Sequence, residues 1–329
     1  MTALREITTE VLLCDDHGRL NRAAVGWARH PRHTANLTGR ARNKRWEYWA
    51  VQAPTHVLAV TVSDLDYAAL CAVYFLAPDG SETVVSKLAP LARVALPNRC
   101  DAGPVAVREG HLSIDLVPNP SGTELIVESP RLSARVAIER PDGHESLSVV
   151  VPWSDTRFQY TVKENTLPAS GEVIVNGRTH AFGQDSWATL DHGRGKWPYR
   201  VTWNWGAGSG RVGDLVVGIQ VGGKWTDGTG STENALTIDG RVHYIGEELQ
   251  WDYDSKDWYA QWHIRSSSDR VDLTFTPWHL RTDRVNLGVL ANDTHQAFGV
   301  WSGSMSDDDG RVVRVDGIRG WAEEVRNRW

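Results

Sequence analysis

The stretch RVDLTFT, from Arg270 to Thr276, alternates apolar and polar side chains along its whole length. Successive side chains of a β-strand point to opposite faces, so Val271, Leu273 and Phe275 would share one face. The same alternation runs from Leu132 to Ile138. We interpret both segments as strands with one face in a core and the other in solvent, which is typical of antiparallel sheets.

Turn signals separate these alternating segments. Asn176-Gly177 and Asp239-Gly240 suit two-residue hairpin loops, because both central positions of such a loop need a positive φ. We find no amphipathic 3.6-residue pattern of helical length, and the best short helix candidate is Ala322 to Trp329. The sequence therefore predicts an all-β protein with roughly twenty antiparallel strands.

The length and an uneven tryptophan distribution indicate two domains. The chain has 329 residues, and 13 of its 16 tryptophans follow residue 150. Turn-forming residues from Glu164 to Gly171 break the alternation between the two halves. We therefore expect domains at residues 1–160 and 161–329, each an antiparallel β-barrel or sandwich, with the boundary between Pro152 and Gly171.

Charge and cysteine content exclude several classes of protein. The formal net charge is -6, and no basic block stands out, which argues against general nucleic-acid binding. No apolar run approaches the length of a transmembrane helix, and Met1 to Asp16 lacks the apolar centre of a signal peptide. Three widely spaced cysteines, Cys14, Cys71 and Cys100, argue against a disulfide framework and favour a cytoplasmic location.

No pattern for a metal or a cofactor emerges. His30 and His33 are separated by Pro31 and lack a supporting cysteine or HExxH motif, so we interpret their segment as a basic, aromatic N-terminal arm. The segment Gly206 to Gly210 is similar to a dinucleotide loop, but a strand pattern follows it where a helix would be needed. We expect a glycine-rich turn at a cavity mouth there, with no metal and no cofactor in the protein.

The most unusual segment runs from Gln184 to Trp205. If Asp185 to Asp191 is a strand, its two carboxylates share one face with the indole of Trp187. An apolar neighbour raises the pKa of a carboxyl group, so this arrangement suits acid–base chemistry. The alternative is that Asp191 caps a turn and that the indoles are ordinary core.

Further aromatic and polar residues could line a pocket for an apolar ligand. Trp203 and Trp205 share a face of the next predicted strand, and the glycine-rich loop from Lys224 to Ala235 contains Glu233. A solvated hairpin loop and, for His263, an ordinary core histidine are the alternatives. The candidate catalytic residues are Asp185, Asp191 and Glu233, and the candidate substrate-binding residues are His192, Trp197, Tyr199, Trp203, Asn204, Trp205, Asn234 and His263.

Five motifs carry a family resemblance: GWARHP at 26–31, LDHGRG at 190–195, WPYR at 197–200 with WNW at 203–205, STENA at 231–235, and GWAEE at 320–324. They resemble a bacterial family catalogued as a domain of unknown function. That family looks like a distant relative of the carotenoid 1,2-hydratase and AttH-like group, which includes tocopherol-cyclase-like proteins and fungal Diels–Alderases. The resemblance implies two lipocalin-like β-barrels side by side, an aromatic-lined pocket, and cofactor-free hydration or cyclisation of hydrophobic molecules.

The expected function is therefore a cofactor-independent hydratase, cyclase or isomerase that protonates an isoprenoid or polyketide with a carboxylic acid. Asp185 or Asp191 would donate the proton, and Glu233 or the other aspartate would take one from water. A developing carbocation would be stabilised by the indoles of Trp197, Trp203 and Trp205.

Two other functions stay open at this stage. A non-catalytic carrier of lipids or isoprenoids would need the aromatic residues but not the carboxylates. A glycosidase would also use tryptophan platforms and paired carboxylates. The expected partner is a hydrophobic small molecule, and the oligomeric state is left open.

Overall fold

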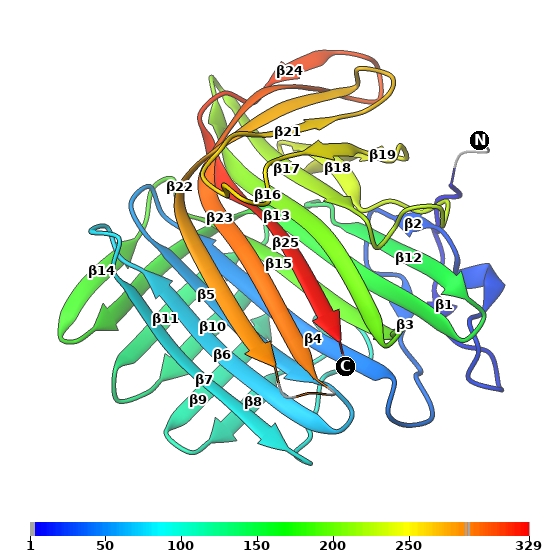
Figure 1. Cartoon of the computed structure of the whole chain (residues 1–329), viewed down its shortest axis with the longest axis horizontal. Coiled ribbons are helices and arrows are strands. Elements are labelled where there is room, and N and C mark those ends of the chain that lie inside the picture. The colour runs from blue at the N-terminus through cyan, green and yellow to red at the C-terminus, as the bar shows by residue number, and fades with distance from the viewer. Residues whose placement is uncertain (1–3, 287, 289, 329) are drawn as a thin grey trace. The chain divides into compact units, whose positions relative to one another are not determined.

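The computed structural model describes residues 4–286, 288 and 290–328. Its described part consists of strands, turns and loops, with one short 3-10 helix at Arg22–Ala24 (Figure 1). The prediction of an all-β protein is confirmed. None of the helical structure in this part is long and apolar enough to cross a membrane.

The chain divides into two compact units. The N-terminal unit is Glu6–Trp197, and the C-terminal unit is Pro198–Trp329 together with Met1–Arg5. Each unit has its own antiparallel sheet, which forms a nearly closed barrel in the first unit and a half-barrel in the second. Two lipocalin-like domains were expected, and each sheet fits that description.

The N-terminal sheet joins strands from all parts of its unit. Its main path is β7 (Glu82–Pro90), β6 (Ala68–Leu76), β5 (Val57–Asp64), β4 (Asn43–Gln52), β15 (Trp187–Lys196), β13 (Arg157–Val175), β11 (Leu132–Glu139), β10 (Gly122–Glu128), β9 (Leu112–Asn119) and β8 (Val105–Glu109). Off this path, β12 (Leu147–Ser154) pairs with β13 and β2 (Trp27–Ala28), and β14 (Arg178–Phe182) pairs with β13. A separate parallel pair is β1 (Val11–Leu12) with β3 (His33–Thr34).

Side-chain alternation explains how this sheet encloses its core. In β11, Leu132, Ala134, Val136 and Ile138 are buried, whereas the residues between them are exposed or half-buried. The strand therefore has the wet and dry faces that the sequence predicts. Its buried residues join a hydrophobic core with contributions from β5, β6, β9 and β10.

The segment expected to link two domains lies inside a strand. β13 continues through residues 164–171, and its register with β15 shifts between Glu164 and Leu167. Thr166 has a positive φ of 62° at this irregularity, which a β-branched residue rarely adopts. The turn-forming residues therefore mark a bulge, and the compact units divide at 197/198 where we expected 160/161.

The C-terminal sheet is ordered β19 (Arg241–Ile245), β18 (Asn234–Ile238), β17 (Leu215–Gly223), β16 (Arg200–Val212), β25 (Ile318–Arg328), β23 (Ala291–Ser306), β22 (Val271–Asn286), β21 (Trp262–Arg265) and β20 (Gln250–Asp252). β24 (Val312–Arg314) pairs with β23. The hairpin predicted at Asp239-Gly240 joins β18 to β19, and both residues have positive φ. Asn176-Gly177 likewise joins β13 to β14 with two positive φ values.

Close packing around Trp301 explains the glycines of β16. Gly206 to Gly210 was expected to be a turn, but it lies within this strand. A Cβ at Gly206 or Gly208 would lie 2.8 Å from a carbon of the Trp301 ring, and one at Gly320 would lie 2.8 Å from Nε1. Glycine is therefore needed because the buried indole contacts the backbone.

The helix expected near the C-terminus is replaced by a strand. Ala322 to Arg328 belongs to β25, which pairs with β16 on one side and β23 on the other. Pairing on both edges satisfies its backbone groups, and this tertiary context overrides the local helical preference. Trp329 lies outside the described residues.

Candidate functional site

A small cavity in the N-terminal unit is bordered by the buried carboxylate of Glu47. Its volume is about 20 Å³, which is enough for one water molecule. Both polar and apolar residues line it, including Glu47, Trp49, Arg99, Asp101, Leu116 and Thr123.

Glu47 lies on β4 and is held by two residues of β15. Its Oε1 accepts hydrogen bonds from His192 Nδ1 at 2.8 Å and from Arg194 Nη2 at 2.5 Å. Although burial alone would raise the pKa of Glu47, His192 and Arg194 lower it to about 2. Glu47 is therefore a fixed negative charge at the wall of the cavity.

Register explains why these groups meet. Glu47 and His192 are direct cross-strand partners in the β4–β15 ladder, so their side chains point to the same face. An ionised Glu47 can only accept hydrogen bonds, so His192 Nδ1 carries the proton and Nε2 is the acceptor nitrogen. Nε2 is buried without a hydrogen-bond partner among the described residues, and burial lowers the pKa of His192.

Arg194 fixes the position of Glu47. Its guanidinium is fully buried and also donates to the carbonyl oxygens of Pro97 at 3.0 Å and Trp46 at 2.6 Å. A planar guanidinium with several partners has little rotational freedom. The carboxylate is thus held rigidly against the loop that borders the cavity.

A second buried carboxyl group, Glu164, lies at the bulge of β13. Arg140 donates to its Oε2 through Nη2 at 2.7 Å and Nε at 3.1 Å, and also pairs with Asp101 at 2.9 Å. Burial raises the pKa of Glu164 to about 7, against the opposing charge of Arg140 and with help from Asp101 and Glu47. This group therefore exchanges a proton near neutral pH.

The two glutamates have opposite electrostatic environments within one barrel. Glu47 and Asp101 line the same cavity, and Arg140 joins Asp101 to Glu164. One carboxyl group is held ionised while its neighbour retains a proton up to about pH 7. Such a divergence between neighbouring acids distinguishes a proton donor from a charge stabiliser in acid–base active sites.

The expected pairing of Asp185 with Asp191 does not occur. β15 begins at Trp187, and Asp185 is exposed in the preceding turn with a φ of 60°. Asp191 is buried on β15, where it accepts a hydrogen bond from Thr161 at 3.0 Å and pairs with Lys163 at 3.1 Å. The two carboxylates therefore do not share a strand face.

Glu233 and Asn234 lie in the C-terminal unit. Glu233 Oε1 accepts the indole proton of Trp225 at 2.6 Å, and its side chain packs against Gly222. Asn234 accepts from the Gly222 nitrogen at 2.7 Å and donates to the Glu247 carbonyl at 2.8 Å. Both residues brace the loop before β18.

Trp203, Asn204 and Trp205 lie on β16, where alternate residues face opposite sides. Trp203 donates to Glu323 at 3.0 Å, and Trp205 donates to Gln220 at 3.0 Å. Asn204 is fully buried and donates to Tyr253 Oη at 3.0 Å. The structure therefore separates Asn204 from the two indoles that flank it in sequence.

The remaining candidates are dispersed. Trp197 ends the N-terminal unit and donates to Gln159 at 2.5 Å, whereas Tyr199 is exposed in the C-terminal unit. His263 is half-buried on β21 and contacts Thr274 Oγ1 at 3.2 Å. Of all the candidate residues, His192 alone belongs to the Glu47 cluster. Their proposed roles stay predictions.

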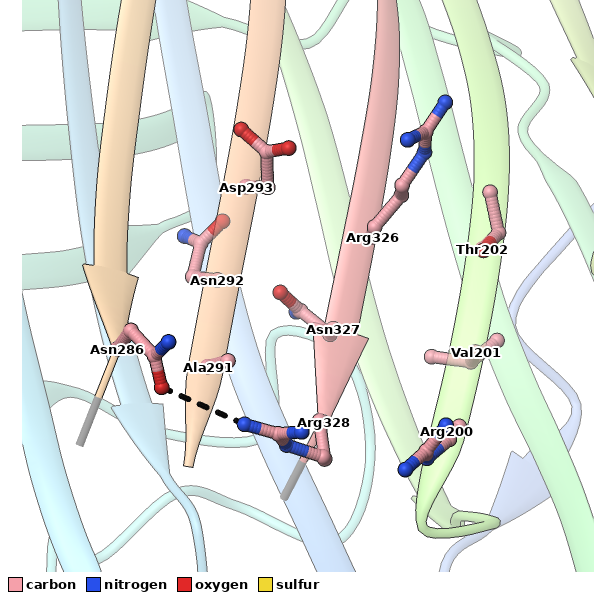
Figure 2. Close-up of a pocket in the computed structure, with 10 residues that line it drawn as sticks. All are labelled: Arg200, Val201, Thr202, Asn286, Ala291, Asn292, Asp293, Arg326, Asn327 and Arg328. Carbon is pink, nitrogen blue, oxygen red and sulfur yellow. Dashed lines mark hydrogen bonds between the residues drawn. The ribbon is translucent and has the colours of Figure 1, made fainter. Parts of the chain in front are cut away.

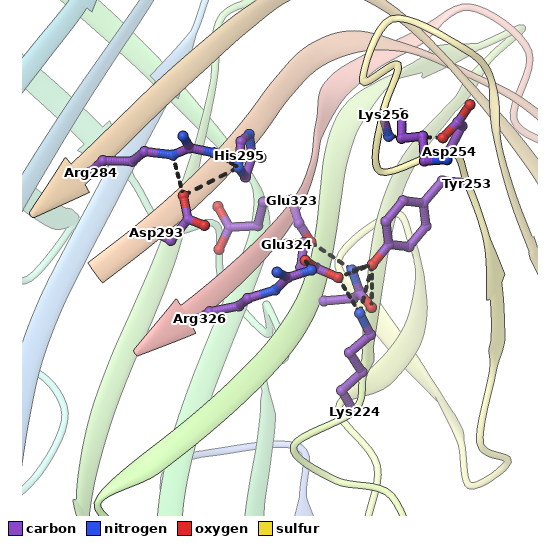
Figure 3. Close-up of polar contacts among 11 residues, drawn as sticks. Lys224, Tyr253, Asp254, Lys256, Arg284, Asp293, His295, Glu323, Glu324 and Arg326 are labelled. Carbon is purple, nitrogen blue, oxygen red and sulfur yellow. Dashed lines mark hydrogen bonds and ion pairs between the residues drawn. The ribbon is translucent and has the colours of Figure 1, made fainter. Parts of the chain in front are cut away.

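A second polar cluster lies in the C-terminal unit (Figure 3). Glu324 accepts hydrogen bonds from Lys224 and Tyr253 and forms an ion pair with Arg326, and Lys224 also donates to Tyr253 Oη at 2.7 Å. These bonds raise the pKa of Lys224 and lower that of Glu324, in both cases against the effect of burial. Both groups are held charged and are less suited to proton exchange at neutral pH than Glu164.

Sequence reasoning missed Glu47, Glu164, Arg140 and Asp101. One signal was available for Glu164, because it continues the face of β13 that Phe158, Tyr160 and Val162 bury. Burying a carboxyl group on the core-facing side of a strand destabilises the fold unless the group has a partner. Its presence there therefore indicates a partner or a special role. The partners themselves are far away in sequence and gave no local signal.

The fold is similar to that of two solved structures. CghA with Sch210972 superposes with a TM-score of 0.54 at 12% identity, covering 87% of this chain and 88% of that one. A putative AttH, NE1406 from Nitrosomonas europaea, gives 0.53 at 13% identity and covers 86% and 92%. At such identities the likeness shows the fold alone, which agrees with the group implied by the motifs.

Sequence comparison places the chain in a family. No curated protein matches it. A family model described as a domain of unknown function, DUF2804, matches residues 4–329. Because this match spans nearly the whole sequence, the chain belongs to the DUF2804 family.

Proposed function

We propose that this protein is a cofactor-independent acid–base enzyme of the hydratase or isomerase type, acting on an apolar isoprenoid or polyketide. The observation that carries this proposal is the neighbouring pair of buried acids, Glu47 and Glu164, with pKa values of about 2 and about 7. A similar fold in CghA with Sch210972 supports a role with small molecules, and the family resemblance supports the reaction type.

Glu164 is the proposed proton donor. A carboxylic acid with a pKa of about 7 is about half protonated at neutral pH, so a large share of molecules can donate the proton. Arg140 would stabilise the carboxylate that forms when the proton leaves. Transfer of the proton to one carbon of an alkene breaks the π bond and leaves a carbocation on the other carbon.

Glu47 is the proposed charge stabiliser. Its fixed negative charge lowers the energy of a carbocation near the cavity mouth. A water in the cavity can then form the new C–O bond, which creates a protonated alcohol. This oxonium is a strong acid, so even a carboxylate with a pKa of about 2 can accept its proton.

The cycle closes when that proton returns from Glu47 to Glu164. Loss of a neighbouring C–H proton to Glu47 would instead move the double bond, which is an isomerisation by the same two groups. Because the cavity holds about one water, the bulk of the substrate would lie outside it. In this proposal the reacting end has to reach both Glu164, which gives the proton, and Glu47 at the cavity wall.

The three carboxyl groups predicted from the sequence fit this chemistry less well. Asp185 is exposed in a turn, and Asp191 is paired with Lys163. Glu233 accepts a short hydrogen bond from Trp225. These residues remain predicted alternatives, and the same experiment tests them.

The decisive experiment replaces Glu164 with Gln, which still accepts hydrogen bonds from Arg140 but carries no acidic proton. Purified variants would be incubated in deuterated water with a panel of isoprenoid and polyketide alkenes, and mass spectrometry would measure deuterium incorporation. We expect Glu164→Gln to lose about a hundredfold or more in turnover. Glu233→Gln, Asp191→Asn and Asp185→Asn serve as matched variants and should retain turnover.

Two results would contradict this assignment. Full activity of Glu164→Gln with loss in one of the matched variants would move the proton donor to that residue. Binding of an alkene without turnover by the unaltered protein would instead favour a carrier, the non-catalytic alternative that the fold also permits.

A further inference from the structure

A polar groove lies at one end of the C-terminal sheet, across β22, β23, β25 and β16 (Figure 2). Its volume is about 460 Å³, which suits a small organic molecule. The charged residues in its lining are three arginines, Arg200, Arg326 and Arg328, and one aspartate, Asp293. The groove is therefore predominantly positive.

Asp293, the only acidic residue among the described residues that line the groove, already has partners. Asp293 Oδ1 pairs with Arg284 Nε at 2.7 Å and with His295 Nε2 at 3.3 Å. Arg326 pairs in turn with Glu324 at 2.6 Å. Among the described residues, neither of these carboxylates pairs with Arg200 or Arg328.

Arg200 and Arg328 have no acidic partner among the described residues. The Arg200 side chain makes no hydrogen bond or ion pair there. Arg328 donates from Nη2 to Asn286 at 3.4 Å, a long contact, and its Nε is buried without a partner. A buried N–H of this kind calls for an acceptor that the described chain does not supply.

The register places these two cations side by side. Arg200 on β16 is the direct cross-strand partner of Arg328 on β25, and Thr202 is the partner of Arg326. Residues two apart in a strand share a face, so all four side chains emerge from one side of the sheet. Like charges directly opposite each other destabilise a sheet, and a bound anion would offset this repulsion.

We propose that this groove binds an oxyanion, the carboxylate or phosphate group of a small molecule, between Arg200 and Arg328. A guanidinium offers parallel N–H groups that match the oxygen spacing of both anions. Ala291, next to Arg328 across the β23–β25 ladder, leaves room for such a ligand because its side chain is short. This site is independent of the acid–base function proposed for the N-terminal unit.

Calorimetric titration with two probes tests the proposal and distinguishes the ligand source. Inorganic pyrophosphate represents phosphates, and succinate represents carboxylates. We expect at least one probe to bind the unaltered protein with a dissociation constant below about 1 mM. Arg200→Gln and Arg328→Gln should each weaken that binding about tenfold or more.

Arg319→Gln is the matched control, because Arg319 is an exposed arginine of the same strand β25 outside the groove. It should bind the probe as the unaltered protein does. Thermal unfolding gives a second readout: the probe should raise the midpoint of the unaltered protein and of Arg319→Gln beyond the effect of sodium chloride at equal ionic strength. Arg200→Gln should lose this shift while remaining at least as stable without ligand, since it removes a like-charge contact.

The proposal is wrong if neither probe binds, or if Arg319→Gln weakens binding as much as the groove variants do. Binding by pyrophosphate alone would identify a phosphate site, and binding by succinate alone a carboxylate site. Unchanged binding in both groove variants would show that the anion lies elsewhere.

Discussion

The two units bury different kinds of large side chain. The largest fully buried residues of the N-terminal unit include Arg194 and Lys44, whereas those of the C-terminal unit are headed by Trp262, Trp301 and Trp321. Buried cations need partners and shift the pKa values of nearby acids. Buried indoles supply apolar area with little dependence on pH. The difference explains why the strongest candidate for proton transfer lies in the unit with fewer tryptophans.

The largest expected effect on stability is in the indole core of the C-terminal unit. Trp301→Ala should reduce the free energy of unfolding by about 3–5 kcal/mol, because glycines line the ring and cannot fill the space left behind. Urea denaturation measures this loss. Trp278→Ala, at a side chain that is 44% exposed, should cost much less. Equal losses would show that burial of Trp301 contributes no more than surface contact.

A comparable loss is expected from the charged core of the N-terminal unit. Arg194→Met should cost about 3 kcal/mol, because it leaves Glu47 buried without its guanidinium partner. Removing both charges in Arg194→Met/Glu47→Gln should recover part of this loss. Strictly additive denaturation free energies would mean that the ion pair itself does not couple the two residues.

The pH dependence of activity should follow Glu164. Turnover is expected to fall as pH rises through about 7, where this carboxyl group ionises, whereas Glu47 stays ionised down to about pH 2. A rate profile from pH 5 to pH 9 measures the basic limb. A profile that is flat across pH 7 would contradict the role of Glu164 as the acid.

Protonation of Glu164 should also make the free energy of unfolding depend on pH. The folded pKa of about 7 lies above the ordinary value of 4.5, so the folded state binds the proton more tightly. This contribution is present below pH 4.5 and is lost as pH rises toward 7. Glu164→Gln should flatten that part of the stability curve, whereas Glu172→Gln, at an exposed site on the same strand, should not.

The smallest expected effect is one in which the units should behave alike. Gly177→Ala and Gly240→Ala should each cost about 1 kcal/mol, because their φ values of 77° and 80° disfavour a side chain. Gly183→Ala, at an open position without a positive φ, should be nearly neutral. Thermal unfolding of the three variants measures this difference, and an equal effect at all three would mean that backbone conformation is not its cause.

The sequence by itself determined the class of fold and the family. Strict alternation in segments such as Arg270–Thr276 identifies strands because the side-chain period of a strand is two. Asn176-Gly177 and Asp239-Gly240 mark hairpins because a two-residue loop needs a positive φ at two consecutive positions, and few residue types adopt one. These signals are local, so they can be read without knowing which strands pair.

Local signals were weaker where the structure departs from regular geometry. The turn-forming residues at 164–171 look the same whether they link two domains or form a bulge within β13. Likewise, the glycines at 206–210 indicate a turn or a close contact equally well, and Trp301 decides between them. In both places the deciding partner belongs to another strand.

Only the tertiary structure decided which side chains form the candidate sites. Glu47 and His192 are 145 residues apart, yet the register of β4 against β15 makes them direct neighbours. Burial then sets their protonation, since the pKa of a carboxyl group depends on its solvent exposure and on charges brought close by folding. The cross-strand pairing of Arg200 with Arg328 arises in the same way. A linear sequence specifies each of these groups, but their chemistry depends on distances that exist only after the strands have paired.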